Sequence, residues 1–96
     1  MKKLSIIIPA YNEERSISQI LGKIHQTRLI GETEKEILII DDGSKDQTLS
    51  ICKQLREQDK RVQYLSFSRN FGKEAGIYAG FKKCRGDYAV LMDVDL

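Results

Sequence analysis

The sequence predicts an α/β fold of three layers, in which helices cover both faces of a parallel sheet. Four short apolar runs, each as long as a typical buried strand, recur along the 96 residues. Stretches with apolar residues at helical spacing separate these runs, and turn-forming residues mark the boundaries. Strands that alternate with helices in this way form βαβ units with right-handed crossovers, so we expect the strands to run parallel.

The individual elements follow from the same patterns. We expect strands at 4–8, 36–41, 62–67 and 87–93, and helices at about 13–28, 45–59 and 73–84. Asn12 is a suitable N-cap for the first helix, and Ser44 with Gln47 has capping-box spacing for the second. If the first three strands run outward and the fourth returns beside the first, the strand order is 3-2-1-4.

Three glycines distinguish the third helix. Gly72, Gly76 and Gly80 are four residues apart, which places them on one helical face. Each interior glycine costs about 1 kcal/mol relative to alanine, so the spacing indicates a close approach to the sheet or to a ligand. A membrane-packing face is excluded because lysines flank the glycines and no long apolar segment contains them.

Composition and length limit the class of protein. The net charge of +2 is too small to indicate a nucleic-acid partner, and the length fits one domain. Cys52 and Cys84 lack the spacing of a metal or redox site, so we expect reduced thiols in a cytoplasmic protein. The sequence shows no signal-peptide pattern and no run of about 20 apolar residues that could cross a membrane.

Two carboxylates follow the last apolar run. Asp93 and Asp95 come after 88–92, and alternate residues of an extended chain share a face. Neighbouring carboxylates repel unless a cation lies between them, and a hard divalent cation that carries substrate phosphates is the usual partner. The alternative is an acidic strand end that is simply solvated.

The earlier strands also end in polar groups. Asp41 and Asp42 follow the second strand, and the segment 9–13 follows the first. In a 3-2-1-4 sheet these segments and Asp93 would meet at one crevice, where ligands of open parallel sheets bind. The glycine patterns of dinucleotide and P-loop sites are missing, which leaves a nucleotide whose base and ribose are read by carboxylates and backbone. For Asp41, capping of the turn at Gly43 remains the alternative.

Four segments together resemble one family. These segments are Ile8-Pro9-Ala10-Tyr11-Asn12-Glu13, Asp41-Asp42-Gly43-Ser44, Ser68-Arg69-Asn70-Phe71-Gly72-Lys73 and Met92-Asp93-Val94-Asp95-Leu96. In this order and spacing they look like the nucleotide-sugar half of an inverting family 2 glycosyltransferase with the Rossmann-like GT-A fold. The likeness is greatest to the branch of dolichol-phosphate mannose synthase and bactoprenol glucosyltransferase, and it covers nearly the whole chain.

The resemblance implies a role for each matching residue. It implies nucleotide contacts for Pro9, Ala10, Tyr11, Glu13, Asp41, Asp42, Arg69, Lys73 and Asp93. The first three would line the base pocket and Glu13 would lie near the ribose. One of the paired aspartates would accept a hydrogen bond from a uracil or guanine N–H. Arg69 and Lys73 would approach the nucleotide or its phosphates, and Asp93 and Asp95 would hold Mg²⁺ or Mn²⁺.

The resemblance also implies what lies outside these residues. Family members are considerably longer, so we expect 1–96 to be a single nucleotide-sugar-binding domain, truncated at its C-terminal end and inactive alone. The donor is expected to be a UDP-sugar or a GDP-sugar, with UDP favoured. The acceptor, a polyprenyl phosphate or a glycan, and the general base would be bound or supplied beyond Leu96, in a protein that could associate with the cytoplasmic face of a membrane.

Two further expectations concern a different class of function. The chain could be a non-catalytic nucleotide-binding or interaction module that has kept the sheet and lost sugar transfer. The strand at 87–93 could also be an exposed edge, which would allow a homodimer to form by edge pairing.

Overall fold

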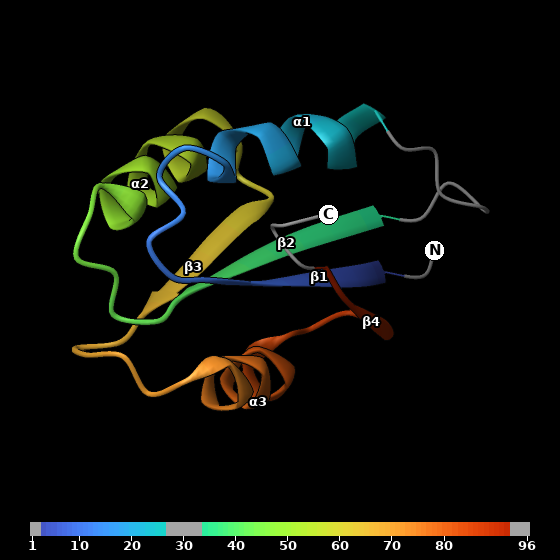
Figure 1. The fold of residues 1–96 in the computed structure, drawn as a ribbon. Helices are drawn as coiled ribbons and strands as arrows, with labels where there is room; N and C mark the ends of the chain where they lie inside the picture. Colours follow the sequence, from blue (N-terminus) through green and yellow to red (C-terminus); the bar gives the residue numbers. More distant parts are fainter. Residues whose placement is uncertain (1–2, 27–33, 93–96) are drawn as a thin grey trace.

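The computed structural model describes residues 3–26 and 34–92, and within them it confirms the predicted fold class. The elements are β1 (Lys3–Ala10), α1 (Ile17–Gln26), β2 (Glu34–Asp41), α2 (Thr48–Gln58), β3 (Val62–Ser66), α3 (Lys73–Lys83) and β4 (Tyr88–Leu91). The strands are parallel and lie in the order β3-β2-β1-β4, as predicted (Figure 1). The sheet therefore reverses its strand order between β1 and β4.

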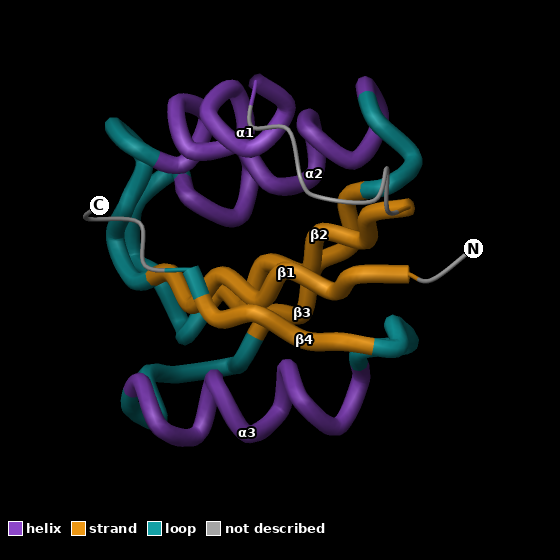
Figure 2. Tube along the Cα trace, turned by 90° about the vertical axis from the view of Figure 1, so that its right-hand side faces the viewer, coloured by secondary structure: helices purple, strands orange, loops and turns teal. Residues whose placement is uncertain are grey.

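Helices cover the two faces of the sheet. Figure 2 shows α1 and α2 on one face and α3 on the other. Successive isoleucines of β1 point to opposite faces: Ile6 and Ile8 join the core under α1 and α2, whereas Ile7 joins the core on the α3 side. Burial on both faces explains why β1 and β2 are continuous apolar runs rather than alternating patterns.

The glycines of α3 bring this helix against the sheet. A Cβ placed on Gly76 would lie 3.4 Å from Ile40 Cγ2, and one placed on Gly80 would lie 2.5 Å from Ile7 Cγ2. The predicted close approach is thus confirmed for these two positions, and it is to the sheet. Gly72 differs, because it precedes the helix with φ +103° and a Cβ there would meet nothing within 4 Å. The positive φ explains why a glycine occupies this position, because residues with a side chain rarely adopt it.

The first helix begins later than predicted. Asn12 has a left-handed φ of 53°, and α1 starts at Ile17 rather than at residue 13. Residues Glu13 to Ser16 form a turn, in which the Ser16 N–H donates to the Glu13 carbonyl at 3.0 Å. The prediction of Asn12 as N-cap is therefore wrong, since its side chain accepts instead from the Lys45 N–H at 2.8 Å.

The capping box predicted for the second helix is also absent. The helix α2 starts at Thr48, and Gln47 at its N-cap makes no side-chain capping bond. The Ser44 hydroxyl instead accepts from the Asn12 N–H at 2.9 Å. Asp46 accepts from the Thr48 N–H at 2.9 Å, so this carboxylate serves the start of the helix.

The last strand lies at an edge of the sheet. Leu91 of β4 is in register with Ile7 of β1, and the Met92 N–H donates to the Ile7 carbonyl at 2.9 Å. Side chains along β4 are exposed, as expected for an edge; the homodimer through this edge stays a prediction. Among the described helices, none has the length and hydrophobicity to cross a bilayer.

Candidate functional site

The loops after β1, β2 and β3 meet at one end of the sheet. Ala10, Asp41 and Ser66 are in register across the three strands, so the loops that follow start side by side. These loops lie together at the left of Figure 1. The sequence analysis predicts ligand binding at this carboxyl end of the sheet.

Hydrogen bonds join the β1–α1 loop to the β2–α2 loop. Beside the two bonds of Asn12, the Glu13 N–H donates to Thr48 Oγ1 at 2.9 Å. The Asp42 N–H donates to the Ala10 carbonyl at 2.9 Å and continues the pairing of β1 with β2 by one bond. The ends of β1 and β2 are therefore held as one unit, which fixes the backbone at 10–13 relative to the paired aspartates.

Asp42 joins the same unit to the β3–α3 loop. The residue is 3% exposed, and its carboxylate accepts from the Phe71 N–H at 2.8 Å, the Gly72 N–H at 3.0 Å and the Asn70 amide at 3.2 Å. A Cβ on Gly43 (φ +70°) would clash with the backbone of Arg69 and Asn70. The β2–α2 and β3–α3 loops thus pack backbone against backbone.

Asp41 is buried at the base of the β2–α2 loop. Its carboxylate accepts from the Ser44 N–H at 3.2 Å and from the Ser66 hydroxyl at 3.3 Å. The first of these bonds caps the turn through Gly43, which was the alternative interpretation from the sequence. Asp41 also lines a cavity, so capping and ligand contact are compatible.

Two cavities lie among these loops and share Tyr11 and Asn70 in their walls. The larger, of 430 Å³, is lined by Tyr11, Asp41, Gly43, Ser44, Lys45, Leu49, Ser66, Phe67, Ser68, Arg69 and Asn70. The smaller, of 290 Å³, is lined by Pro9, Ala10, Tyr11, Glu13, Asp42, Asn70, Gly72 and Lys73. Every nucleotide-site residue predicted from the sequence, apart from Asp93, lines one of them. A cavity of 560 Å³ bordered by α2 and Tyr64 of β3 contains none of them.

The cavity walls contain residues to which the sequence analysis gave no role in ligand binding. Asn70 lines both cavities, and Ser44 lines the larger one. Asn70 belongs to the motif 68–73, and this membership is the one feature of the sequence that could have indicated a role in the site. The Asn70 amide donates to the Asp42 carboxylate, and this bond holds Asn70 between the two cavities. Because the bond connects residues 28 apart in the sequence, no local sequence pattern predicts it.

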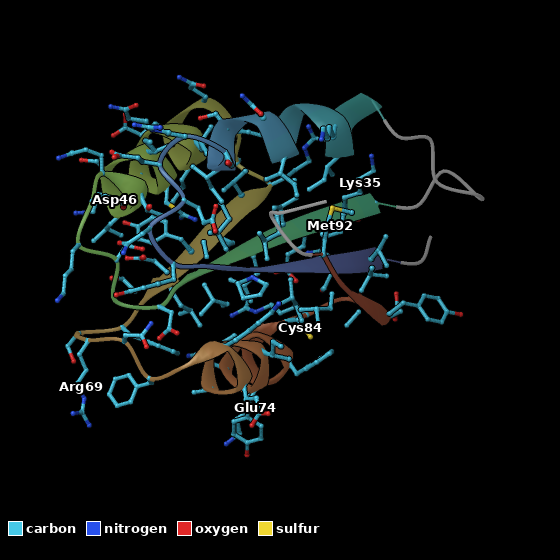
Figure 3. All side chains as sticks on the ribbon, viewed as in Figure 1. Lys35, Asp46, Arg69, Glu74, Cys84 and Met92 are labelled. Atoms are coloured by element: carbon cyan, nitrogen blue, oxygen red, sulfur yellow. The ribbon has the colours of Figure 1, made fainter. Side chains whose placement is uncertain are left out.

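An aromatic side chain contacts Arg69, one of the two cationic residues in the wall of the larger cavity. The Arg69 guanidinium lies 4.6 Å from the centroid of the Phe71 ring, within the range of a cation–π interaction. Phe71 in turn contacts Phe67 edge to face, with ring centroids 5.6 Å apart. Figure 3 shows Arg69 on the loop between β3 and α3. Lys73, in the first turn of α3, supplies a cation to the wall of the smaller cavity.

A thiol lies beneath the site but cannot serve as its nucleophile. Cys52 is fully buried in α2, and burial, together with the charge of Asp41, raises the pKa of its thiol to about 12. It therefore stays protonated at neutral pH. Both cysteines are free in the structure, and the reduced state of their thiols stays a prediction.

The predicted metal ligands lie outside the described residues. Asp93 and Asp95 come directly after Met92, the last described residue. The Met92 N–H donates to the Ile7 carbonyl of β1, two residues before Pro9, and the Met92 side chain packs against the core on the α1 side (Figure 3). Over 3–26 and 34–92, no group of three or more histidine, cysteine or acidic side chains is placed to hold a metal ion. The metal site therefore stays a prediction.

Comparison with known proteins identifies similar sequences. The bactoprenol glucosyl transferase of Shigella phage SfV is 42% identical over 94 residues, which are 98% of this chain and 31% of that protein. The undecaprenyl-phosphate 4-deoxy-4-formamido-L-arabinose transferase of Pseudomonas fluorescens strain Pf-5 is 39% identical, over 97% of this chain and 28% of that protein. The chain thus spans about a third of the length of these relatives.

Solved structures and a family match agree with the sequence relatives. S. aureus TarS in complex with UDP-GlcNAc superposes with a TM-score of 0.79 at 30% identity, over 97% of this chain and 26% of that chain. A mannosyltransferase of Pyrobaculum calidifontis shares the fold with a TM-score of 0.86 at 22% identity, over 98% of this chain and 28% of the other. Residues 5–96 match the family described as Glycosyl transferase family 2, and the chain therefore belongs to this family.

Proposed function

We propose that this chain is the donor-binding part of a glycosyltransferase that moves a sugar from a nucleoside-diphosphate sugar to an acceptor. One observation carries the proposal: two adjoining cavities at the carboxyl ends of β1, β2 and β3 bring together eight of the nine nucleotide-site residues that the resemblance implies. They are Pro9, Ala10, Tyr11, Glu13, Asp41, Asp42, Arg69 and Lys73. Convergence of three sequence segments on one end of the sheet is what a site for one extended ligand requires.

The walls of these cavities offer groups suited to a base and a ribose. Pro9, Ala10 and Tyr11 form an apolar and aromatic wall for the planar base. A buried carboxylate, Asp41 or Asp42, is a strong acceptor for the imide N–H of uracil or the N1–H of guanine. Glu13 lies on the same wall and would accept from a ribose hydroxyl.

Positive charge is needed where the diphosphate binds. Arg69 and Lys73 flank the two cavities, and we assign them to the nucleotide and its phosphates. Asp93 and Asp95 would hold Mg²⁺ or Mn²⁺, and Asp93 would thereby contact the nucleotide. The donor set fits, because paired carboxylates are the ligands that these hard cations prefer. When bound, the cation would stabilise charge on the leaving nucleoside diphosphate.

The relatives suggest the identity of donor and acceptor. TarS is solved with UDP-GlcNAc, and we favour a UDP-sugar for this chain. The Pyrobaculum mannosyltransferase, solved with GDP-Man and Mn²⁺, supports the fold alone at its low identity. The names of the phage and Pseudomonas relatives suggest a polyprenyl phosphate acceptor. We assign the acceptor site and general base to polypeptide beyond these 96 residues, and the free thiols suit a cytoplasmic setting.

Calorimetric titration of the folded chain tests this proposal. With Mn²⁺ present, UDP or GDP should bind. ADP and CDP should bind more weakly, because adenine and cytosine lack the ring N–H that donates a hydrogen bond to the carboxylate. A thermal-shift series with the same four nucleotides gives an independent measurement. A folded chain that shows neither heat nor a thermal shift with millimolar UDP and GDP would overturn the proposal.

A further inference from the structure

We propose that Asp46 and Thr48 are positioning residues of the nucleotide site, which hold the β1–α1 loop so that Glu13 faces the ligand. Both lie outside the walls of the two cavities as the described residues form them, so they would act through Glu13. Figure 3 shows Asp46 on the loop before α2, and Thr48 is the first residue of that helix. The inference rests on the proposed function, which assigns Glu13 to the ribose.

Three consecutive backbone N–H groups of the β1–α1 loop donate to side-chain oxygens that follow β2. Because these donors belong to the main chain, each bond fixes the course of the loop itself. Two side chains of the loop accept in return from backbone N–H groups after β2. The bonds are Asn12 N–H to Ser44 Oγ at 2.9 Å, Glu13 N–H to Thr48 Oγ1 at 2.9 Å and Glu14 N–H to Asp46 Oδ2 at 3.3 Å, with Lys45 N–H to Asn12 Oδ1 at 2.8 Å and Gln47 N–H to Glu14 Oε2 at 3.2 Å in return.

Asp46 sets the orientation of the Thr48 hydroxyl. Its Oδ1 accepts both from the Thr48 N–H, at 2.9 Å, and from the Thr48 hydroxyl. Burial alone would raise the pKa of Asp46, but the hydrogen bonds from Thr48 and from the Glu14 N–H hold the pKa below its ordinary value. An ionised carboxylate can only accept, so the hydroxyl hydrogen points to Asp46 and a lone pair of the hydroxyl oxygen is left for the Glu13 N–H.

Glu13 is fixed on both sides of its Cα atom. Its N–H donates to Thr48, which is fully buried, so water has no access to the accepting hydroxyl. Its carbonyl accepts from the Ser16 N–H at 3.0 Å and from the Ile17 N–H at 2.9 Å, where α1 begins. A main chain held in this way limits where the Glu13 side chain can lie, and that side chain lines the smaller cavity.

A cluster at the other end of the sheet has the same chemistry and provides a matched control. There the buried Ser5 hydroxyl donates to Glu36 Oε2 at 2.7 Å and accepts from the Gly86 N–H at 2.8 Å. This hydroxyl also joins a carboxylate to a backbone N–H, but at the amino end of the sheet, whereas the two cavities lie at the carboxyl end. Loss of the Ser5 hydroxyl should therefore affect stability alone.

Calorimetric titration of two Thr48 variants tests the positioning role. Thr48→Val keeps the shape and removes the hydroxyl, so the Glu13 N–H loses its acceptor. We expect the affinities for UDP and for uridine to fall by the same factor, about three- to tenfold, because the ribose is common to both ligands. Thr48→Ser keeps the hydroxyl but loses a buried methyl group, so it should lower Tm and keep the UDP affinity within about twofold. Guanine ligands replace these if the wild-type chain prefers GDP.

A double-mutant cycle shows whether Thr48 acts through Glu13. Glu13→Ala removes the side chain, so Thr48→Val should weaken UDP binding less in the Glu13→Ala background than alone. The control Ser5→Ala should lower Tm and leave the UDP affinity unchanged. If Thr48→Val does not fold, Asp46→Asn replaces it in the cycle, because one of its two acceptor oxygens becomes a donor group, and the same coupling to Glu13→Ala is expected.

The outcomes separate this inference from the proposed function. A wild-type chain that binds neither UDP nor GDP overturns both. If the wild-type chain binds UDP, an unchanged affinity in Thr48→Val, or additive effects of Thr48→Val and Glu13→Ala, overturns the positioning role alone. The positioning role is also overturned if Ser5→Ala loses as much affinity as Thr48→Val, because general stability would then account for both losses.

Discussion

At the scale of single residues, Glu36 is a nearly buried carboxylate whose charge is stabilised by hydrogen bonds. It lies at the amino end of the sheet, away from the site. It is 9% exposed, and its Oε2 accepts from the Ser5 hydroxyl at 2.7 Å and from the Arg85 N–H at 2.9 Å. The Gly86 N–H donates to the same Ser5 oxygen at 2.8 Å. Burial alone would raise the pKa of Glu36, but these two bonds to its carboxylate, with the charges of Lys3 and Arg85, hold the pKa below its ordinary value. The cluster anchors the start of β4 to β1 and β2.

Stability should therefore depend on the charge of Glu36. Because its folded pKa is lowered, its contribution is fully present above the ordinary pKa of about 4.3 and is lost as the pH falls through the folded pKa. Glu36→Gln should lower the free energy of unfolding by about 2 kcal/mol at pH 7, and the difference from wild type should shrink in acid. Urea unfolding at both pH values measures this.

Glu34→Gln provides the control on the same strand. Glu34 is exposed, so its substitution should change stability by no more than about 0.5 kcal/mol. Equal stabilities of Glu36→Gln and wild type at pH 7 would contradict the role given to this cluster.

At the scale of elements, the packing of α3 on the sheet depends on small residues. Gly80 lies directly over Ile7, a fully buried side chain of the central strand β1, and its position leaves no room for a Cβ. Gly22 in α1 is different, since it is exposed and a Cβ there would meet nothing within 4 Å. The same substitution should thus have opposite effects in the two helices.

Gly80→Ala should destabilise the chain by about 1–3 kcal/mol, because the new methyl group overpacks the interface between α3 and β1. Gly22→Ala should stabilise it by about 0.5–1 kcal/mol, because alanine has the higher helix propensity and restricts the unfolded chain. Chemical denaturation of both variants gives the two values. A Gly80→Ala variant as stable as wild type would mean that α3 does not pack this closely.

At the scale of the whole molecule, the proposed site exists because the parallel topology collects loops that are far apart in the sequence. Tyr11, Asp41 and Arg69 come from three loops and line one cavity. The fourth contribution would come from the residues after β4, which pairs with β1 on the side opposite to β2. A ligand that spans these loops would link all four strands, so its binding should stabilise the entire fold.

This topology leads to a prediction about the metal. Replacing Asp93 and Asp95 together by Asn should abolish the Mn²⁺ dependence of nucleotide binding and leave the fold intact, since the substitution removes two negative charges that lie close together in the sequence. UDP titrations with Mn²⁺ and with a chelator, on wild type and on the double variant, measure it. Unchanged metal dependence in the double variant would rule out these ligands.

The sequence by itself determined the layers, and it predicted the strand order and the end of the sheet where the site residues gather on the condition that the fourth strand returns beside the first. A short apolar run such as 37–40, rich in β-branched residues and set between helical patterns, favours a buried strand, and parallel crossovers then dictate where the strand ends meet. The tertiary structure alone decided how the loops are held. The partners of Asn12, Ser44 and Asp42 lie about 30 residues away in the sequence, so local capping rules assigned the first two to helix starts that form elsewhere. Local patterns predict elements because propensity and burial act along the chain, whereas a polar side chain pairs with whichever donor or acceptor the fold places beside it.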